Sequence, residues 1–206
     1  MIQSMGRWKF VFARPEIEDE FKNVERKICV AAHSTPYFDG IISYNALRHF
    51  GENNLLVYVR GPSPYFPEWC RRVDNNRGGF IRDECEELQN VPNFCRVIFP
   101  SGGTVEWKTG FYVLAQKLNA KIVILGIDYE QYCVVVDSVI QPRETFEETK
   151  NICLKKLRKY KAGPFCYILR VLFNYGCETY TYNIIQLYYC RGVCLLFILF
   201  FFYNVG

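Results

Sequence analysis

The sequence is poor in histidine and lacks the paired cysteines of common metal sites. Only two histidines, His33 and His49, occur among its 206 residues, and its ten cysteines include no Cys-x-x-Cys pair. Neither histidine stands at a ligand spacing from a cysteine, so we expect no zinc site. Residues 1–14 contain no uninterrupted apolar core of a secretory signal, and we therefore expect reduced thiols in a cytosolic setting.

Strong charge of one sign is absent as well. The formal net charge of +4 suits an anionic membrane surface or an acidic substrate, and it does not imply a nucleic-acid partner. The chain also has no internal repeat and no low-complexity linker, and half of its residues are hydrophobic, which excludes disorder. Its length favours one domain with one hydrophobic core.

Apolar runs long enough to cross a bilayer are lacking too. From Gly163 onward charges become rare, and the run Cys194–Tyr203 is purely apolar, but a bilayer span needs about 20 residues. Extending this run back to Ile184 adds Gln186 and Arg191. We expect residues 163–206 to form an apolar C-terminal extension, either a membrane-associating segment or a buried terminal strand or helix.

Alternating strand and helix patterns fill the chain before this extension. Buried strands are expected at 28–32, 55–59, 95–99 and 121–127, one or two antiparallel strands within 131–140, and helices at 42–50, 107–117 and 144–161. Less regular patterns predict a leading strand or membrane-interface segment at 6–12 and a connector or short helix at 16–27. They also predict a short helix at 68–73, a brief strand within 74–82 and a helix at 83–89. We therefore expect residues 1–162 to form an α/β domain, with a mixed, largely parallel central sheet flanked by helices.

The segment after the first long buried strand carries a candidate general base. His33 follows that strand directly, and Asp39 stands six residues later. Ligands of α/β sheets bind beyond the carboxyl ends of the strands, and a histidine held by a carboxylate accepts a proton near neutral pH. Alternatively, Asp39 caps the next helix and His33 is an ordinary loop histidine.

A short glycine loop, Pro100–Thr104, separates a predicted strand from a predicted helix. Free backbone N–H groups in such a loop can bind a phosphate, although a plain tight turn has the same sequence. The loop lacks the spacing and the Gly-Lys-Ser/Thr ending of a Walker motif, and the chain has no G-x-S-x-G nucleophile elbow.

Four segments in order resemble the motif blocks of the glycerolphosphate acyltransferase superfamily, which includes the 1-acylglycerol-3-phosphate acyltransferases. Residues 33–39 are similar to its H-x4-D block, and Gly78-Gly-Phe-Ile-Arg-Asp83 to its G-G-I-x-x-(D)-R block. Phe99-Pro-Ser-Gly-Gly-Thr104 resembles F-P-E-G-T-R, and Trp107-Lys-Thr-Gly-Phe-Tyr112 resembles W-K-(S/T)-G-F-Y. A buried strand ending Ile-Asp-Tyr129 follows, as it often does in that family, and the resemblance covers roughly residues 28–130.

The resemblance implies an acyltransferase-like fold and a phospholipid-synthesis reaction at the cytoplasmic face of a membrane. A fatty acyl group would move from acyl-CoA or acyl carrier protein to a hydroxyl of a lysophospholipid or glycerol-phosphate acceptor, without a metal or resident cofactor. His33 would be the general base and Asp39 would orient it. The acceptor and its phosphate would be bound by a set of loop residues and cations: Ser101, Gly102, Gly103, Thr104, Arg77, Arg82 and Lys108.

The chain departs from the family pattern at two places. Five residues, not four, separate His33 from Asp39, and Ser101 stands where the family has glutamate. The arginine of the same block has no counterpart at Thr104 or Val105. Three alternatives follow: a different acceptor, a cation supplied by another segment, or a catalytically inactive membrane-associated module that retains the acyltransferase fold.

Overall fold

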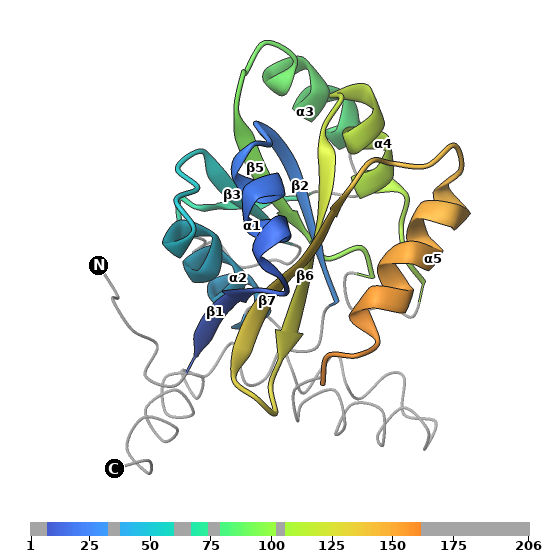
Figure 1. Ribbon diagram of the computed structural model, residues 1–206. Coiled ribbons are helices and arrows are strands. Elements are labelled where there is room, and N and C mark those ends of the chain that lie inside the picture. Colours follow the sequence, from blue (N-terminus) through green and yellow to red (C-terminus); the bar gives the residue numbers. More distant parts are fainter. Residues whose placement is uncertain (1–7, 33–37, 60–66, 74–78, 102–105, 162–206) are drawn as a thin grey trace, which may run out of the picture. The chain divides into compact units, whose positions relative to one another are not determined.

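The computed structural model describes residues 8–32, 38–59, 67–73, 79–101 and 106–161 of the chain. Within these ranges a seven-stranded sheet is flanked by five helices (Figure 1). The strands are β1 (Lys9–Phe12), β2 (Arg26–Ala31), β3 (Leu55–Val59), β4 (Cys70–Arg72), β5 (Phe94–Ile98), β6 (Lys121–Asp128) and β7 (Cys133–Ile140). The helices are α1 (Pro15–Lys22), α2 (Phe38–His49), α3 (Phe80–Leu88), α4 (Gly110–Lys117) and α5 (Phe146–Leu157).

The strands lie in the order β1-β7-β6-β2-β5-β3-β4. From β6 to β4 all neighbours are parallel, whereas β7 runs antiparallel to β6 and pairs in parallel with β1. The expected α/β fold with a mixed, largely parallel sheet is confirmed. The leading strand at β1 and the antiparallel strand at β7 are also confirmed.

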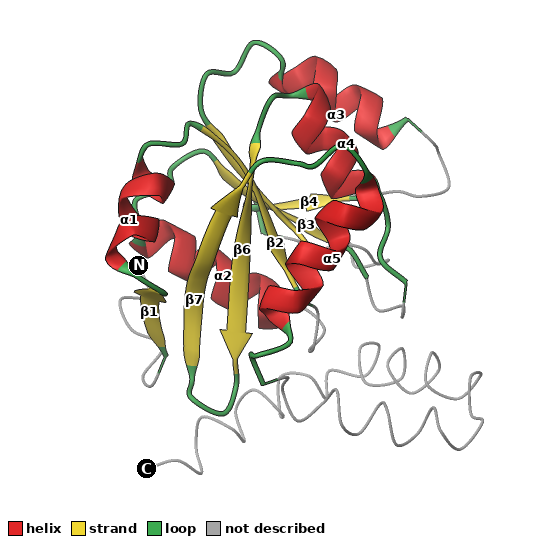
Figure 2. Cartoon of the chain, turned by 45° about the vertical axis from the view of Figure 1, so that its right-hand side comes forward, coloured by secondary structure: helices red, strands yellow, loops and turns green. Residues whose placement is uncertain are grey.

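Helices cover both faces of the sheet, α1 and α2 on one side and α3, α4 and α5 on the other (Figure 2). The central strand β2 sends Ile28 and Val30 into the core under α3 to α5, and Cys29 and Ala31 into the core under α1 and α2. All four are fully buried. A strand covered on both faces has no solvent side, which explains the apolar run from Ile28 to Ala31.

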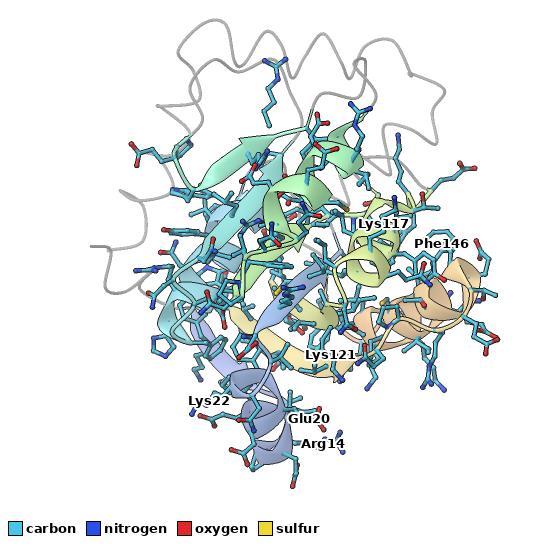
Figure 3. The ribbon with its side chains drawn as sticks, turned by 90° about the horizontal axis from the view of Figure 1, so that it is seen from above. Arg14, Glu20, Lys22, Lys117, Lys121 and Phe146 are labelled. Atoms are coloured by element: carbon cyan, nitrogen blue, oxygen red, sulfur yellow. The ribbon has the colours of Figure 1, made fainter. Side chains whose placement is uncertain are left out.

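The first helix shows how an acidic and basic segment joins this core. Ile17 and Phe21 of α1 are buried, while Glu20 and Lys22 lie on its outer side (Figure 3). The expected alternative of a short helix is therefore confirmed for the first part of the 16–27 segment. The rest of that segment leads into β2.

Two expectations between residues 68 and 82 are wrong. Residues 70–72 form strand β4, not a helix, because the free edge of β3 pairs with Cys70 and Arg72. Phe80 to Arg82 form the first turn of α3, not a strand. Gly79 precedes that turn with a φ of +87°, a left-handed conformation suited to glycine, so the helix begins three residues before Asp83.

A buried carboxylate joins α3 to the sheet. Glu84 is fully buried, and its two oxygens lie 3.0 Å from Nε of Arg71 and 3.4 Å from Nε of Arg96. The Tyr58 hydroxyl also donates to Glu84. Burial and the neighbouring carboxylate raise the pKa of Tyr58, so the hydroxyl stays protonated as a donor. We call these four residues the Glu84 cluster.

A second buried carboxylate, Asp137 on β7, holds the end of α5 and the residues after it. It binds Lys159, Lys156 at 3.3 Å and the Tyr160 hydroxyl at 2.8 Å. The Tyr160 ring lies over Gly126 of β6, in space that a Cβ would occupy. Burial opposes ionisation of Asp137, but the hydrogen bonds from Lys159 and Tyr160 and the charge of Lys156 hold its pKa below the ordinary value.

Because of this anchor, the free energy of unfolding should decrease at acidic pH. Because the native pKa of Asp137 lies below that of the unfolded chain, its stabilisation is complete at neutral pH and is lost as the pH falls below about 4. Urea unfolding should show Asp137→Asn less stable than the wild type at pH 7, with the difference shrinking toward pH 3.5. The control Asp83→Asn removes a carboxylate that is 60% exposed and should show little difference at either pH. A constant deficit of Asp137→Asn across this range would contradict the assignment.

Six cysteines lie in the described ranges, and all are free thiols. The Sγ atoms of Cys29 and Cys95, on adjacent strands, are 3.4 Å apart. Burial raises the pKa of Cys70 to about 11 and that of Cys153 to about 12, so neither is a thiolate at neutral pH. The six thiols are Cys29, Cys70, Cys85, Cys95, Cys133 and Cys153.

The predicted C-terminal extension, residues 163–206, lies outside the described residues. In the ranges that are described, no helix has the length and apolar character needed to cross a membrane.

Candidate active site

Three neighbouring parallel strands bring the predicted motif segments to one edge of the sheet. β2 lies between β5 and β6, and all three end at the edge to which the β6 arrow points in Figure 2. Val30 of β2 pairs with Ile98 of β5, and His33 and Ser101 each follow three residues after this pair. Two segments that lie seventy residues apart in sequence therefore leave the sheet side by side.

Asp39 lies in the first turn of α2, beside this edge. Its side chain is fully buried, and its Oδ1 accepts a hydrogen bond of 2.5 Å from the Tyr129 hydroxyl. Since α2 already includes Phe38, Asp39 is inside the helix and does not cap it. Ligands of α/β sheets bind at the carboxyl edge, so Asp39 lies where such sites occur, and its predicted role in orienting His33 stays a prediction.

Tyr129 itself is held firmly. It follows the last residue of β6, and its backbone N–H donates to the Lys161 carbonyl at 3.0 Å. Its ring packs edge-on against Trp8, with 5.2 Å between ring centroids. The preceding residue, Asp128, accepts the backbone N–H groups of Glu130 and Gln131 and closes the turn into β7. The Tyr129 hydroxyl thus has a fixed direction toward Asp39.

Removing this hydroxyl should weaken the fold. Tyr129→Phe leaves the buried Asp39 carboxylate with one donor fewer, and a hydrogen bond to a charged group contributes about 1.5–3 kcal/mol. Urea unfolding at pH 7 should show a loss of that order. The control Tyr132→Phe removes the hydroxyl of a residue that is 42% exposed and should change stability little. Equal effects of the two variants would contradict the role given to Tyr129.

The segment from β5 to α4 is closed by a backbone hydrogen bond of 3.0 Å from the Lys108 N–H to the Pro100 carbonyl. This bond holds the backbone of Lys108 beside that of Ser101, which is half-buried, while the Lys108 side chain is exposed. Of the predicted acceptor-binding residues, the structure therefore brings Ser101 and Lys108 together. Gly102, Gly103 and Thr104, and with them the predicted phosphate loop, lie outside the described residues.

The aromatic residues after Lys108 are structural. Phe111 is fully buried beside Trp107, with 5.7 Å between centroids, and the Tyr112 hydroxyl donates to the Glu144 carbonyl at 2.7 Å. Phe146 of α5 packs against both Phe111 and Tyr112. These residues fix α4 under α5, and thereby hold the Lys108 end of the loop.

Arg82 belongs to the first turn of α3, which packs against the start of α4. Cδ1 of Ile81 lies 3.4 Å from the position of a Cβ on Gly110. The Arg82 side chain is 74% exposed and lies 3.3 Å from Asp83 and 3.9 Å from Glu86. Exposed pairs of this kind contribute about 0–1 kcal/mol, so an anionic ligand can compete for the guanidinium. Arg71, in contrast, is paired with both Glu84 and Glu87, and Arg96 is paired with the buried Glu84.

The other predicted site residues, His33 and Arg77, lie outside the described residues. So does the contact expected between His33 and Asp39. His49, the other histidine, is exposed at the end of α2, and its ring packs near Phe10 and Phe50.

Sequence reasoning gave no role to Tyr129 or to Arg72. Arg72 is an exposed cation at the carboxyl end of β4, on the same edge of the sheet. The Ile-Asp-Tyr ending of β6 was the available signal for Tyr129, whereas Arg72 was assigned to a helix. No group of three or more His, Cys, Asp or Glu side chains within the described ranges could hold a metal ion.

Comparisons add no further information about this edge. The chain matches no protein-family model, no curated protein and no solved structure.

Proposed function

We propose that this protein is an acyltransferase of the 1-acylglycerol-3-phosphate acyltransferase type. It moves a fatty acyl group from acyl-CoA or acyl carrier protein to a hydroxyl of a lysophospholipid or glycerol-phosphate acceptor. The reaction takes place at the cytoplasmic face of a membrane, as a step of phospholipid synthesis, and needs no resident cofactor.

One observation carries this proposal: the strand order gathers motif segments that are distant in sequence. The strands before His33, before Ser101 and before Tyr129 are neighbours and end at the same edge. At that edge Asp39 is buried and held by Tyr129. If these segments are acyltransferase motifs, they must meet at one edge of the sheet. Segments that resemble the motifs by accident need not meet.

The proposed chemistry needs one base and one oriented carboxylate. His33 removes the proton from the acceptor hydroxyl as its oxygen attacks the thioester carbonyl. The new C–O bond forms, the C–S bond breaks, and the departing thiolate takes the proton from His33. Asp39 keeps the imidazole in the tautomer that presents a free nitrogen to the acceptor, so the acceptor hydroxyl has the place of the serine in a Ser-His-Asp triad.

The acceptor phosphate lies between the starts of α3 and α4 in this proposal. Arg82 offers a planar fork for bidentate phosphate binding, and Lys108 adds a point charge beside Ser101. Arg77 precedes α3 by three residues and is a third candidate. One of these cations, or Arg72, replaces the arginine that the F-P-E-G-T-R block would supply.

The test is release of free CoA by the purified full-length protein in detergent. Acyl-CoA donors of several chain lengths are offered with lysophosphatidic acid, glycerol 3-phosphate and a panel of neutral and zwitterionic lysolipids. The proposal predicts acceptor-dependent CoA release and an acylated lipid product by mass spectrometry. Absence of acceptor-dependent release across the whole panel would overturn it.

A second candidate function is a catalytically inactive membrane-associated module that retains the acyltransferase fold. It is favoured by Ser101 in the place of a glutamate and by the additional residue between His33 and Asp39. This candidate predicts lipid binding without turnover, and any acyl transfer that depends on His33 would exclude it.

A further inference from the structure

Four aromatic side chains gather at the edge of the sheet beside Asp39. Trp8 is at their centre, with ring-centroid distances of 5.2 Å to Tyr129, 5.8 Å to Tyr132 and 6.3 Å to Phe38. They come from the start of β1, the start of α2 and the turn between β6 and β7. We call this group the aromatic edge.

The aromatic edge includes most of the large hydrophobic residues that are exposed on the described part of the chain. Three large hydrophobic residues are exposed in the described ranges: Tyr132 at 42%, Val11 at 41% and Phe38 at 37%. Two of the three, Tyr132 and Phe38, belong to the aromatic edge. Aromatic rings with a polar group, as in Trp and Tyr, favour the level of the lipid headgroups, where one end is apolar and the other wet.

The last described residue, Lys161, lies at this edge. It accepts the hydrogen bond from the Tyr129 backbone, and Tyr160 is held on β6 and β7 by Gly126 and Asp137. The 44 residues from 163 onward contain only three charged side chains, Arg170, Glu178 and Arg191. Two exposed rings offer too little surface to cover so much apolar chain, whereas a bilayer can accept the rings and the extension together.

We propose that the aromatic edge docks on the surface of a lipid bilayer that contains anionic phospholipid. Exposed Lys9 and Lys161 flank the edge against one exposed carboxylate, Glu130, so the local charge favours anionic headgroups. Docking in this orientation turns the carboxyl ends of β2 and β5 toward the lipid. This docking surface would also supply the lipid acceptor of the proposed reaction. Only that last point rests on the proposed function.

The first test measures which tryptophan meets the lipid. The full-length chain has three tryptophans. Trp69→Phe with Trp107→Phe leaves Trp8 as the reporter, and Trp8→Phe with Trp107→Phe leaves Trp69, which stacks on Tyr44 next to β4 at the opposite end of the strand order. Vesicles of brominated phosphatidylcholine and phosphatidylserine should quench Trp8 strongly and Trp69 weakly. Equal quenching, or binding without quenching of Trp8, would overturn the proposal and assign lipid binding to the extension alone.

A second measurement remains informative if a tryptophan variant fails to fold. Phe38→Ser with Tyr132→Ser changes only exposed rings and should weaken vesicle binding by about tenfold. The matched control Val11→Ser removes an equally exposed apolar side chain outside the aromatic edge and should bind as the wild type does. Unchanged binding of the double variant would overturn the proposal. Quenching of Trp8 without acyl transfer would refute only the proposed function, and acyl transfer without this quenching would refute only the docking surface.

Discussion

Asp39→Asn is expected to lower the kcat of acyl transfer by about 10²–10⁴-fold. The substitution keeps the shape of the side chain and an oxygen that can accept from Tyr129, but it removes the charge that holds the general base in the correct tautomer. Because the change affects orientation of the base, KM for the acceptor should change much less than kcat. Steady-state CoA release at saturating donor measures both constants.

The control for this variant is Asp128→Asn. Asp128 is another buried aspartate at the same edge, but its carboxylate accepts the N–H groups of Glu130 and Gln131 in a turn, a role that asparagine also fills. Activity should remain within a few-fold of the wild type. Similar losses of kcat in the two variants would indicate a general effect of altering this edge and would contradict the role given to Asp39.

Glu84→Ala is expected to destabilise the fold by about 3–5 kcal/mol, because it leaves buried charge without its partner. Arg96 is only 3% exposed and would lose its carboxylate, and the Tyr58 hydroxyl would lose its acceptor, whereas Arg71 would keep its pair with Glu87. Urea unfolding followed by circular dichroism measures the loss. Glu84→Gln should cost less, since its amide still accepts hydrogen bonds, and it provides a measurement if the alanine variant does not fold.

The matched control is Glu86→Ala on the same helix. Its side chain is 68% exposed and lies 3.9 Å from the Arg82 guanidinium, so the variant should stay within about 0.5 kcal/mol of the wild type. If Glu84→Ala were as mild as this control, the Glu84 cluster would not be the contact that fixes α3 on the sheet. The placement of Arg82 at the start of α3 would then lose its structural support.

Hydrophobic runs predicted the centre of the fold well. β2 and β6 are buried on both faces, so each contains an uninterrupted apolar run, 28–31 and 122–127, and their positions follow directly from the pattern. The helix expected at 144–161 was also found as α5, where the Thr145 side chain caps the first turn by accepting the Glu148 N–H. In these segments local preference and tertiary burial agree.

Prediction failed where tertiary contacts decide local structure. Cys70 to Arg72 have little strand character of their own and become β4 only because β3 offers a free edge. Phe80 and Ile81 are typical strand residues, but Gly79 and the packing of Ile81 near Gly110 begin α3 there. Glu84 looked like one exposed acid among several in a polar helix, and nothing local shows that it faces the buried Arg96 and the partly buried Arg71.

The candidate site was predictable as a set of motifs but not as an arrangement. Motif order alone does not show that β2 lies between β5 and β6, because strand order depends on the whole sheet. For the same reason the bond from Tyr129 to Asp39, across ninety residues, could not be deduced. This bond adds Tyr129, at the end of β6, to the residues of the candidate site.

The paired comparison of the two histidine variants tests the central claim most directly. His33 and His49 are the only histidines in the chain, and His49 lies exposed at the end of α2, so each variant removes one imidazole. With acyl-CoA and the best lysolipid acceptor, His49→Ala should release CoA at close to the wild-type rate, and His33→Ala should be slower by about 10³-fold or more. Equal rates for His33→Ala and His49→Ala would contradict the proposal that His33 is the general base of an acyltransferase.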